Sequence, residues 1–274
     1  MAARSWSKVV RTFTRAKNTS SKLFNPQESV IVRQPAVATT VPSVSPFPLK
    51  LETYLRLANI PYKNRFGRAF SSKGKIPWME YKDDKVADSN FCIRYLNEKF
   101  SVDLDAGLSA KGKGVGHAVL TMLEENTYWT IVYYRWIEIP HKTTNFLFPT
   151  ASPWMKKLIA FGGQRRVKSY LHGHGIGRHT KDEIYSIACR DLASISAMLD
   201  NAPFLLGDKP TLVDTAAFGL LANIVWHDTE SPLNAMIRKD FQNIEGYCQR
   251  IKEQAWPDWD DEIAKRKAIT YKKK

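Results

Sequence analysis

The stretch Gly74-Lys75-Ile76-Pro77-Trp78-Met79-Glu80-Tyr81, followed by Val86-Ala87-Asp88-Ser89, decides the fold. Pro77 would stand at the start of a strand, where its missing N–H is tolerated. Asp88 and Ser89 would open the next helix, and the N–H groups at a helix N-terminus favour a carboxylate. The stretch therefore predicts a strand, a hairpin partner and a helix whose first residues are a candidate site for an anionic ligand.

The hydrophobic pattern on either side orders the chain into two parts. Period-two alternation and helical spacing predict a β-α-β-β-β-α series, with strands at 29–34, 62–66, 78–81 and 85–87 and helices at 46–58 and 90–100. This is the thioredoxin-like arrangement with a mixed four-stranded sheet. After about Leu104 the pattern is helical, with a loop expected at 140–150 and helices at 115–137, 153–171, 181–199, 212–226 and 235–252. Strands first and helices later predict an α+β fold with two domains, at 28–103 and 104–262.

The net charge of +14 is concentrated at the two ends of the chain. Residues 1–27 hold six Lys/Arg and no acid, and residues 263–274 hold six more and no acid. Subtracting these twelve charges leaves +2 for residues 28–262. Because a basic tail is not a recognition surface, we expect no specific nucleic-acid binding, and we expect 263–274 to be a basic tail.

The N-terminal segment 1–27 has two interpretations. Its apolar residues Trp6, Val9, Val10 and Phe13 have helical spacing, which is typical of a basic amphipathic helix that serves as a mitochondrial presequence or a membrane-surface anchor. The alternative is a flexible tail.

Three widely spaced cysteines without C-x-x-C spacing indicate a reducing compartment. We therefore expect a cytoplasmic protein, with a mitochondrial or membrane-associated location as the alternative.

Further segments resemble a known superfamily. Thr211-Leu212-Val213-Asp214 and the preceding Phe204–Pro210 resemble the capping box of the core helix, and the approach to it, in the C-terminal domain of glutathione transferases. A closer resemblance, over about residues 28–255, is to the failed axon connections proteins in the metaxin-related and cadmium-responsive branch. It rests on four segments together, 42–55, 74–81, 124–129 and 175–179.

The resemblance implies a glutathione site. Ile76-Pro77 would be a cis peptide whose backbone pairs with the cysteinyl part of glutathione, and Asp88 and Ser89 would hold the γ-glutamyl group. Ser45 stands where these enzymes place the catalytic residue, and its hydroxyl would stabilise the glutathione thiolate. The simpler interpretation is that Ser45 caps the helix that begins at Pro46.

Two departures from the family weaken this site. The family more often has Glu or Gln in place of Asp88, so the shorter side chain reduces the reach. Only nine residues separate Phe66 from Ile76, where glutathione transferases have a second helix that covers the glycine end of glutathione. We therefore expect a turn in place of this helix and a more open site.

Two other groups of residues suggest chemistry. His172-Gly173-His174 and His179 are close in sequence, but no cysteine or carboxylate has metal-ligand spacing beside them, so we expect no metal. Glu124 and Glu125 are adjacent on a helix and so do not face one site together, which makes a general acid/base pair unfavoured.

The first hypothesis for function is an interaction or scaffold protein with weak or no catalysis. It would act through protein partners and, through residues 1–27, at a membrane surface; the resemblance implies a role in axon development and allows a homodimer. The alternative is a glutathione S-transferase for a small electrophile, with glutathione as cofactor and Ser45 as the thiol-activating residue. The sequence leaves the question of enzymatic activity open.

Overall fold

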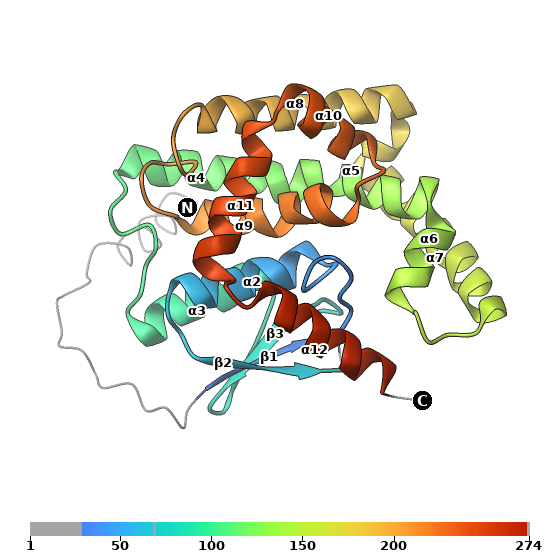
Figure 1. Ribbon diagram of the computed structural model, residues 1–274, viewed down its shortest axis with the longest axis horizontal. Coiled ribbons are helices and arrows are strands. Elements are labelled where there is room, and N and C mark those ends of the chain that lie inside the picture. The colour runs from blue at the N-terminus through green and yellow to red at the C-terminus, as the bar shows by residue number, and fades with distance from the viewer. Residues whose placement is uncertain (1–28, 68–69, 273–274) are drawn as a thin grey trace, which may run out of the picture.

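The computed structural model describes residues 29–67 and 70–272 of the chain. The basic segment 1–27 lies outside the described residues. Figure 1 shows a sheet at one side of the molecule, two helices over it, and a larger helical part beyond them. The α+β arrangement predicted from the sequence is confirmed.

The sheet contains four strands, β1 (Val30–Gln34), β2 (Tyr62–Phe66), β3 (Trp78–Tyr81) and β4 (Asp84–Ala87). Their order is β2-β1-β3-β4, with β1 and β2 parallel and the other neighbours antiparallel. The mixed sheet is therefore as predicted.

Two helices pack against this sheet, α2 (Pro46–Leu57) and α3 (Ser89–Phe100). Alternate residues of β1 and β3 point to them, and the shared core contains Val30, Val32, Leu51, Leu55, Met79 and Leu96, all without measurable exposure. Period-two burial on β1 and helical spacing on α2 explain why these segments form their elements.

The helical part begins with a long rod of α4 (Ala110–Met122) and α5 (Tyr128–Tyr133), with π-helical turns at Leu123–Thr127 and Tyr134–Glu138. The remaining helices follow in sequence. They are α6 (Pro140–Leu147), α7 (Pro153–His174), α8 (Lys181–Leu199), α9 (Leu212–Ala222), α10 (Pro232–Asp240), α11 (Asn243–Ala255) and α12 (Trp259–Tyr271). The most completely buried helix is α9, because every residue from Val213 to Ala222 is buried. The rod, where the sequence predicts one helix at 115–137, has one face exposed.

Three predictions about the helical part are wrong. The expected loop at 140–150 contains α6, because Pro140 begins a helix at its first position instead of ending the region. The helix predicted at 235–252 is two helices, α10 and α11, which meet at Phe241 and Gln242.

The third correction concerns the C-terminal tail predicted at 263–274. Residues 263–271 belong to α12 (Trp259–Tyr271), whose first turn contains three acidic residues that suit a helix N-terminus. Figure 1 shows α12 lying against the sheet-containing part of the molecule, although the strands belong to residues 30–87 and α12 to the end of the chain. The domain boundary near residue 103 stays a prediction. Within 29–67 and 70–272, no helix is both long and apolar enough to cross a membrane.

Candidate functional site

The strand register brings Pro77 and Asp88 to one edge of the sheet. Trp78, the first residue of β3, pairs with Ala87, the last residue of β4, and with Arg33 near the end of β1. Pro77 and Asp88 are the next residues outward from the Trp78–Ala87 pair. The Ile76–Pro77 peptide bond is cis, as the resemblance implied. Pro77 is buried and Ile76 is half-buried.

Asp88 and Ser89 form the start of α3. The Asp88 carboxylate accepts a hydrogen bond of 3.0 Å from the backbone N–H of Asn90. Asp88 has φ 86°, a strained conformation for a residue with a Cβ, at a cost of about 1–3 kcal/mol. Ser89 is 3% exposed. A ligand would therefore meet the Asp88 edge of the helix before the Ser89 hydroxyl.

Ser45 occupies the N-cap position of α2, but its side chain makes no capping hydrogen bond. Pro46 and Pro48 have no N–H, so Phe47 is the only backbone donor among the first three helical residues. The interpretation of Ser45 as a working cap is therefore wrong. The same two prolines leave this helix end with few donors for a thiolate.

A buried ion pair lies beside the start of α3. The Lys50 ammonium, on α2, donates to Glu124 Oε1 at 2.6 Å and to Asn90 Oδ1 at 2.5 Å. The other Glu124 oxygen accepts from Asn90 Nδ2 at 2.6 Å. Burial lowers the pKa of Lys50, and the Glu124 charge opposes this change in part. Glu124 thus links the helical part to both helices of the sheet-containing part.

The loop between β1 and Ser45 is fastened to the helical part along its length. Five side chains of the helical part bond to this loop: Thr270 to Ala36 O (2.6 Å), His227 to Thr39 Oγ1 (2.9 Å), Arg266 to Pro42 O (3.0 Å), Asn223 to Ser43 O (3.3 Å) and Arg135 to Val44 O (2.6 Å). These bonds order the segment that leads to the candidate catalytic residue.

The sequence analysis missed the residues that fasten this loop. Arg135 pairs with Asp228 at 2.8 Å and donates to Asn223 at 3.0 Å. Arg135 and Asn223 lie in π-helical turns, which are often found at functional sites. Burial and the charge of Arg135 lower the pKa of His227 to about 3, so this imidazole is neutral at pH 7. The sequence did contain a signal for these residues, because Arg135 and Asn223 each interrupt an apolar helical run.

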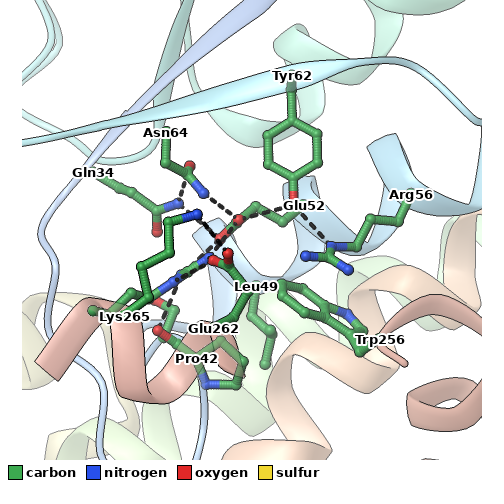
Figure 2. Close-up of polar contacts among 12 residues, drawn as sticks. Gln34, Pro42, Leu49, Glu52, Arg56, Tyr62, Asn64, Trp256, Glu262 and Lys265 are labelled. Carbon is green, nitrogen blue, oxygen red and sulfur yellow. Dashed lines mark hydrogen bonds and ion pairs between the residues drawn. The ribbon is translucent and has the colours of Figure 1, made fainter. Parts of the chain in front are cut away.

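Figure 2 shows a second buried network, centred on the carboxylate of Glu52. Arg266 donates to both Glu52 oxygens, at 3.0 and 2.7 Å, and neither side chain is exposed. Gln34, Tyr62 and Asn64 also donate to Glu52, and Glu262 pairs with Arg266 at 3.0 Å. This network fixes α12 against α2 and the sheet.

The region that would cover the glycine end of glutathione is a turn. In the described residues between Phe66 and Ile76, the Ser71 N–H donates to the carbonyl of Lys75, and the Ser71 hydroxyl accepts from two following N–H groups. The described residues 70–75 therefore form the turn that the sequence analysis expected in place of a second helix. Two surface cavities of about 380 and 340 Å³ are lined by other residues, and none of the five predicted site residues lines either one.

The cysteine and histidine side chains described next are buried or contact other side chains. Burial raises the pKa of the Cys92 thiol to about 12, so it is not a thiolate at neutral pH. His174 stacks on Trp129 with ring centroids 4.8 Å apart, and His179 lies 3.6 Å from Glu183. In the part of the chain that the structure describes, no three His, Cys, Asp or Glu side chains are placed to hold a metal ion.

Comparison with known proteins places this geometry in a family. The glutathione S-transferase N-terminal domain family matches residues 46–143, and the glutathione S-transferase C-terminal domain family matches residues 188–251. The chain is similar to "Failed axon connections" of Drosophila melanogaster, with 33% identity over 81% of this chain. It spans 56% of the length of that relative.

The other similar proteins are a glutathione S-transferase and two metaxins, as their names give them. The "Isoprene-epoxide--glutathione S-transferase" of Rhodococcus sp. (strain AD45) is 29% identical over 78% of this chain and 94% of its own length. "Metaxin-2" of Mus musculus is 22% identical over 77% of this chain and 82% of its own length. The chain is also similar to the "Mitochondrial outer membrane import complex protein METAXIN" of Arabidopsis thaliana, with 24% identity over 82% of this chain and 72% of its own length.

Solved structures agree with the fold. The β-etherase LigF of Sphingobium sp. strain SYK-6 has a TM-score of 0.62 at 11% identity, with 86% of this chain and 99% of that chain covered. The glutathione transferase GSTFuA3 of Phanerochaete chrysosporium has a TM-score of 0.57 at 14% identity, with 83% and 97% covered. The two matched domains, the fold and these relatives together show that the chain belongs to the metaxin-related branch of the glutathione transferase-like superfamily.

Proposed function

We propose that this protein is an interaction or scaffold protein of the glutathione transferase fold, with weak or no glutathione-dependent catalysis. The observation that carries the proposal is the start of α2, where Pro46 and Pro48 leave one N–H among the first three residues. A glutathione thiolate beside Ser45 would receive little stabilisation from a helix end with so few donors.

Three further features support the same function. A turn near Ser71 stands where glutathione transferases have the helix that covers the glycine end of glutathione. The loop that leads to Ser45 is occupied by hydrogen bonds to the helical part. The polar groups beside Asp88, namely Lys50, Asn90 and Glu124, already satisfy one another. Few groups remain to converge on a peptide ligand.

The relatives indicate the kind of partners. The Arabidopsis relative carries the name of a mitochondrial outer membrane import complex protein, and the Drosophila relative is named for axon connections. We infer that this chain acts by binding other proteins, and that a role in axon development is the first to test in an animal. A homodimer remains a prediction.

Glutathione binding tests the proposal directly. The full-length protein should not be retained on immobilised glutathione, and calorimetry with millimolar glutathione should give no heat of binding. A chloronitrobenzene substrate should not be turned over above the uncatalysed rate. Retention on the resin together with turnover that disappears in Ser45→Ala would overturn the proposal.

A matched variant tests the physical reason. Pro48→Ala returns one N–H to the first turn of α2, so glutathione binding should increase if the missing donors limit the site. Pro232→Ala, at the first position of α10 far from the site, is the control and should change nothing. If glutathione is absent from both variants, the lack of donors is not the reason, and the turn near Ser71 is the next feature to examine.

The second candidate function is a glutathione S-transferase for a small electrophile. It is favoured by the cis Ile76–Pro77 bond, by the position of Asp88 and Ser89 at the start of α3, and by the Rhodococcus relative. In this function Ser45 would hydrogen-bond the sulfur while Asp88 and Ser89 hold the γ-glutamyl end. Because Ser45 has no capping bond, Ser45→Ala should remove turnover without loss of folding.

Location depends on residues 1–27 in this proposal. We propose a cytoplasmic protein, with a mitochondrial or membrane-surface position if this basic segment is an anchor. A fluorescent fusion should change its distribution when residues 1–27 are deleted. An unchanged diffuse distribution would leave the interpretation of the segment as a flexible tail.

A further inference from the structure

One region of the chain combines strong positive charge with a complete lack of acids. Residues 139–181 span α6, α7 and the start of α8 and contain eight Lys/Arg and no Asp or Glu. Residues 28–262 together carry +2, so removing these eight charges leaves −6 for the rest of that range. The near-neutral body of the protein is therefore a basic hairpin on an acidic remainder.

The same region exposes large apolar side chains on one helix. Trp154, Leu158 and Phe161 of α7 are 63%, 58% and 68% exposed. Their spacing of i, i+4 and i+7 places them on one face, and we call these three residues the α7 stripe. Arg165 and Lys168 continue the same face toward the end of the helix, and both are exposed.

The opposite face of α7 explains why the stripe points outward. Ala160 and Leu171 are buried against the rest of the helical part. Gly163 lies so close to the ring of Trp136 that an added Cβ would be 2.2 Å from it. Since this packing fixes the rotation of α7, the exposure of the α7 stripe is set by the fold.

The hairpin stands out from the remainder of the molecule. Figure 1 shows α6 and α7 at one end of the helical part, and the turn between them projects beyond the neighbouring helices. Trp154 is the second residue of α7, directly after this turn. The α7 stripe thus begins at the projecting end, where a flat surface can reach it.

Charge decides between possible occupants of this surface. In a two-fold dimer that places α7 against α7, the cations of both copies would face each other with no acid on either hairpin. A basic helix with Trp, Leu and Phe on one face instead fits the interface of an anionic bilayer, where the rings enter the headgroup region and Lys/Arg meet the lipid phosphates. We propose that the α7 stripe, with Lys157, Arg165 and Lys168, docks this protein on an anionic lipid bilayer.

Vesicle binding tests the apolar half of the surface. Full-length protein should sediment with vesicles of phosphatidylcholine and phosphatidylserine and not with phosphatidylcholine alone. Replacing the three residues of the α7 stripe by Ser should reduce partitioning at least about tenfold, because the apolar contact is lost. The control is Phe91→Ser, which removes a side chain 49% exposed on α3 and should leave partitioning unchanged.

Charge variants test the basic half. The triple variant Lys157→Gln, Arg165→Gln and Lys168→Gln should weaken partitioning at least about tenfold, and added salt should weaken binding of the original protein. The control is Lys209→Gln with Lys239→Gln and Arg190→Gln, which removes three exposed charges elsewhere. All variants keep residues 1–27, so any contribution of that segment is common to them.

Insertion itself gives a separate signal. Brominated lipids should quench the fluorescence of Trp154, and Trp154→Phe should remove that part of the quenching while binding is retained. Equal vesicle binding by the original protein and both triple variants would overturn the proposal. So would binding to neither vesicle, or loss of a dimer in the α7 stripe variant without any vesicle binding, which would assign the surface to a protein contact.

Discussion

Arg266 is buried, although its place in a basic stretch near the end of the chain predicts an exposed side chain. Its side chain lies fully buried between Glu52 and Glu262. Burial alone raises the pKa of Glu52, but Arg266 and the bonds from Asn64 and Gln34 outweigh it, so the pKa lies below its ordinary value. Arg266 therefore keeps a buried carboxylate charged.

Removal of Arg266 should be strongly destabilising. Arg266→Met leaves the Glu52 carboxylate buried without its counter-charge, which costs about 3–5 kcal/mol of unfolding free energy. Urea unfolding at pH 7 measures this loss. The control is Lys265→Met on the same helix, whose side chain is 63% exposed and whose ion pair contributes about 0–1 kcal/mol. Equal losses in the two variants would contradict the buried network.

The pH dependence of the same variant has a defined sign. In the original protein the lowered pKa of Glu52 stabilises the fold above the ordinary glutamate value of about 4.3, and this stability is lost as pH falls through the folded pKa. In Arg266→Met, burial without the guanidinium should raise the pKa of Glu52. The stability difference between the two proteins should then shrink from pH 7 toward about pH 5. A constant difference over this range would contradict the assignment of the charge to Glu52.

Lys50 and Glu124 should show direct coupling across the two parts of the protein. Their 2.6 Å contact is buried, so Lys50→Met and Glu124→Gln should be non-additive. A double-mutant cycle from urea unfolding should give a coupling of about 1–3 kcal/mol. The matched cycle uses Lys142 and Glu230, an exposed pair, and should give less than about 1 kcal/mol.

Among the elements, two helix starts behave differently although each has a hydroxyl residue at its N-cap. Thr180 caps α8 in a complete capping box, with its hydroxyl accepting from Glu183 N–H and the Glu183 carboxylate accepting from Thr180 N–H. Ser45 precedes α2 without a capping bond. The difference lies in the following residues, because the third residue of α2 is Pro48 and cannot donate.

This difference predicts the effect of two matched substitutions. Thr180→Ala should cost about 1 kcal/mol, and Ser45→Ala should cost only a few tenths of that or nothing. Thermal unfolding of both variants under the same conditions checks the prediction. A loss in Ser45→Ala as large as that in Thr180→Ala would show that the Ser45 hydroxyl caps α2 after all.

Most elements were predictable, and the exceptions have physical reasons. The strands and α2, α3, α8 and α9 follow from period-two or helical spacing of apolar residues. The missed helix α6 has few apolar residues and begins with Pro140, a residue type that can end a helix as well as begin one. The break at Phe241 lies within a continuous helical pattern, so no local signal distinguishes one helix from two.

At the scale of the whole molecule, one close contact joins the two parts. Gly219 of α9 lies against α2, and an added Cβ would be 2.6 Å from the carbonyl oxygen of Pro46 and 2.9 Å from Lys50 N. Figure 1 shows α9 running beside α2 at this junction. Backbone atoms cannot move aside as a flexible side chain can, so the separation of the two helices depends on this glycine.

Two glycine substitutions should have opposite signs. Gly219→Ala should destabilise the protein by about 1–3 kcal/mol because it forces α9 away from α2. Gly114→Ala, on an exposed part of α4 where the added Cβ would meet no atom within 4 Å beyond the adjacent backbone of its own helix, should stabilise by about 0.5–1 kcal/mol. Denaturant unfolding of both variants measures the signs. Stabilisation by Gly219→Ala would mean that the two parts are less closely packed than the structure shows.

For the candidate site, the sequence indicated the residues but not their state. The cis Ile76–Pro77 bond, the turn in place of a second helix, and the start of α3 at Asp88 and Ser89 all agree with expectation. The roles of these residues and of Ser45 in binding or catalysis stay predictions. Lys50 was not expected in the site, because nothing local indicates that a lysine in an amphipathic helix will be buried.

The sequence by itself determined most of the strands and helices and the capping box that opens α9, because these depend on neighbours within a few residues. Only the tertiary structure decided which charges are buried and which apolar residues are exposed. Arg266 is buried because it meets Glu52, 214 residues away in sequence. Trp154 is exposed because Gly163 turns the other face of α7 toward Trp136. Such contacts depend on how distant segments pack, and no local pattern contains that information.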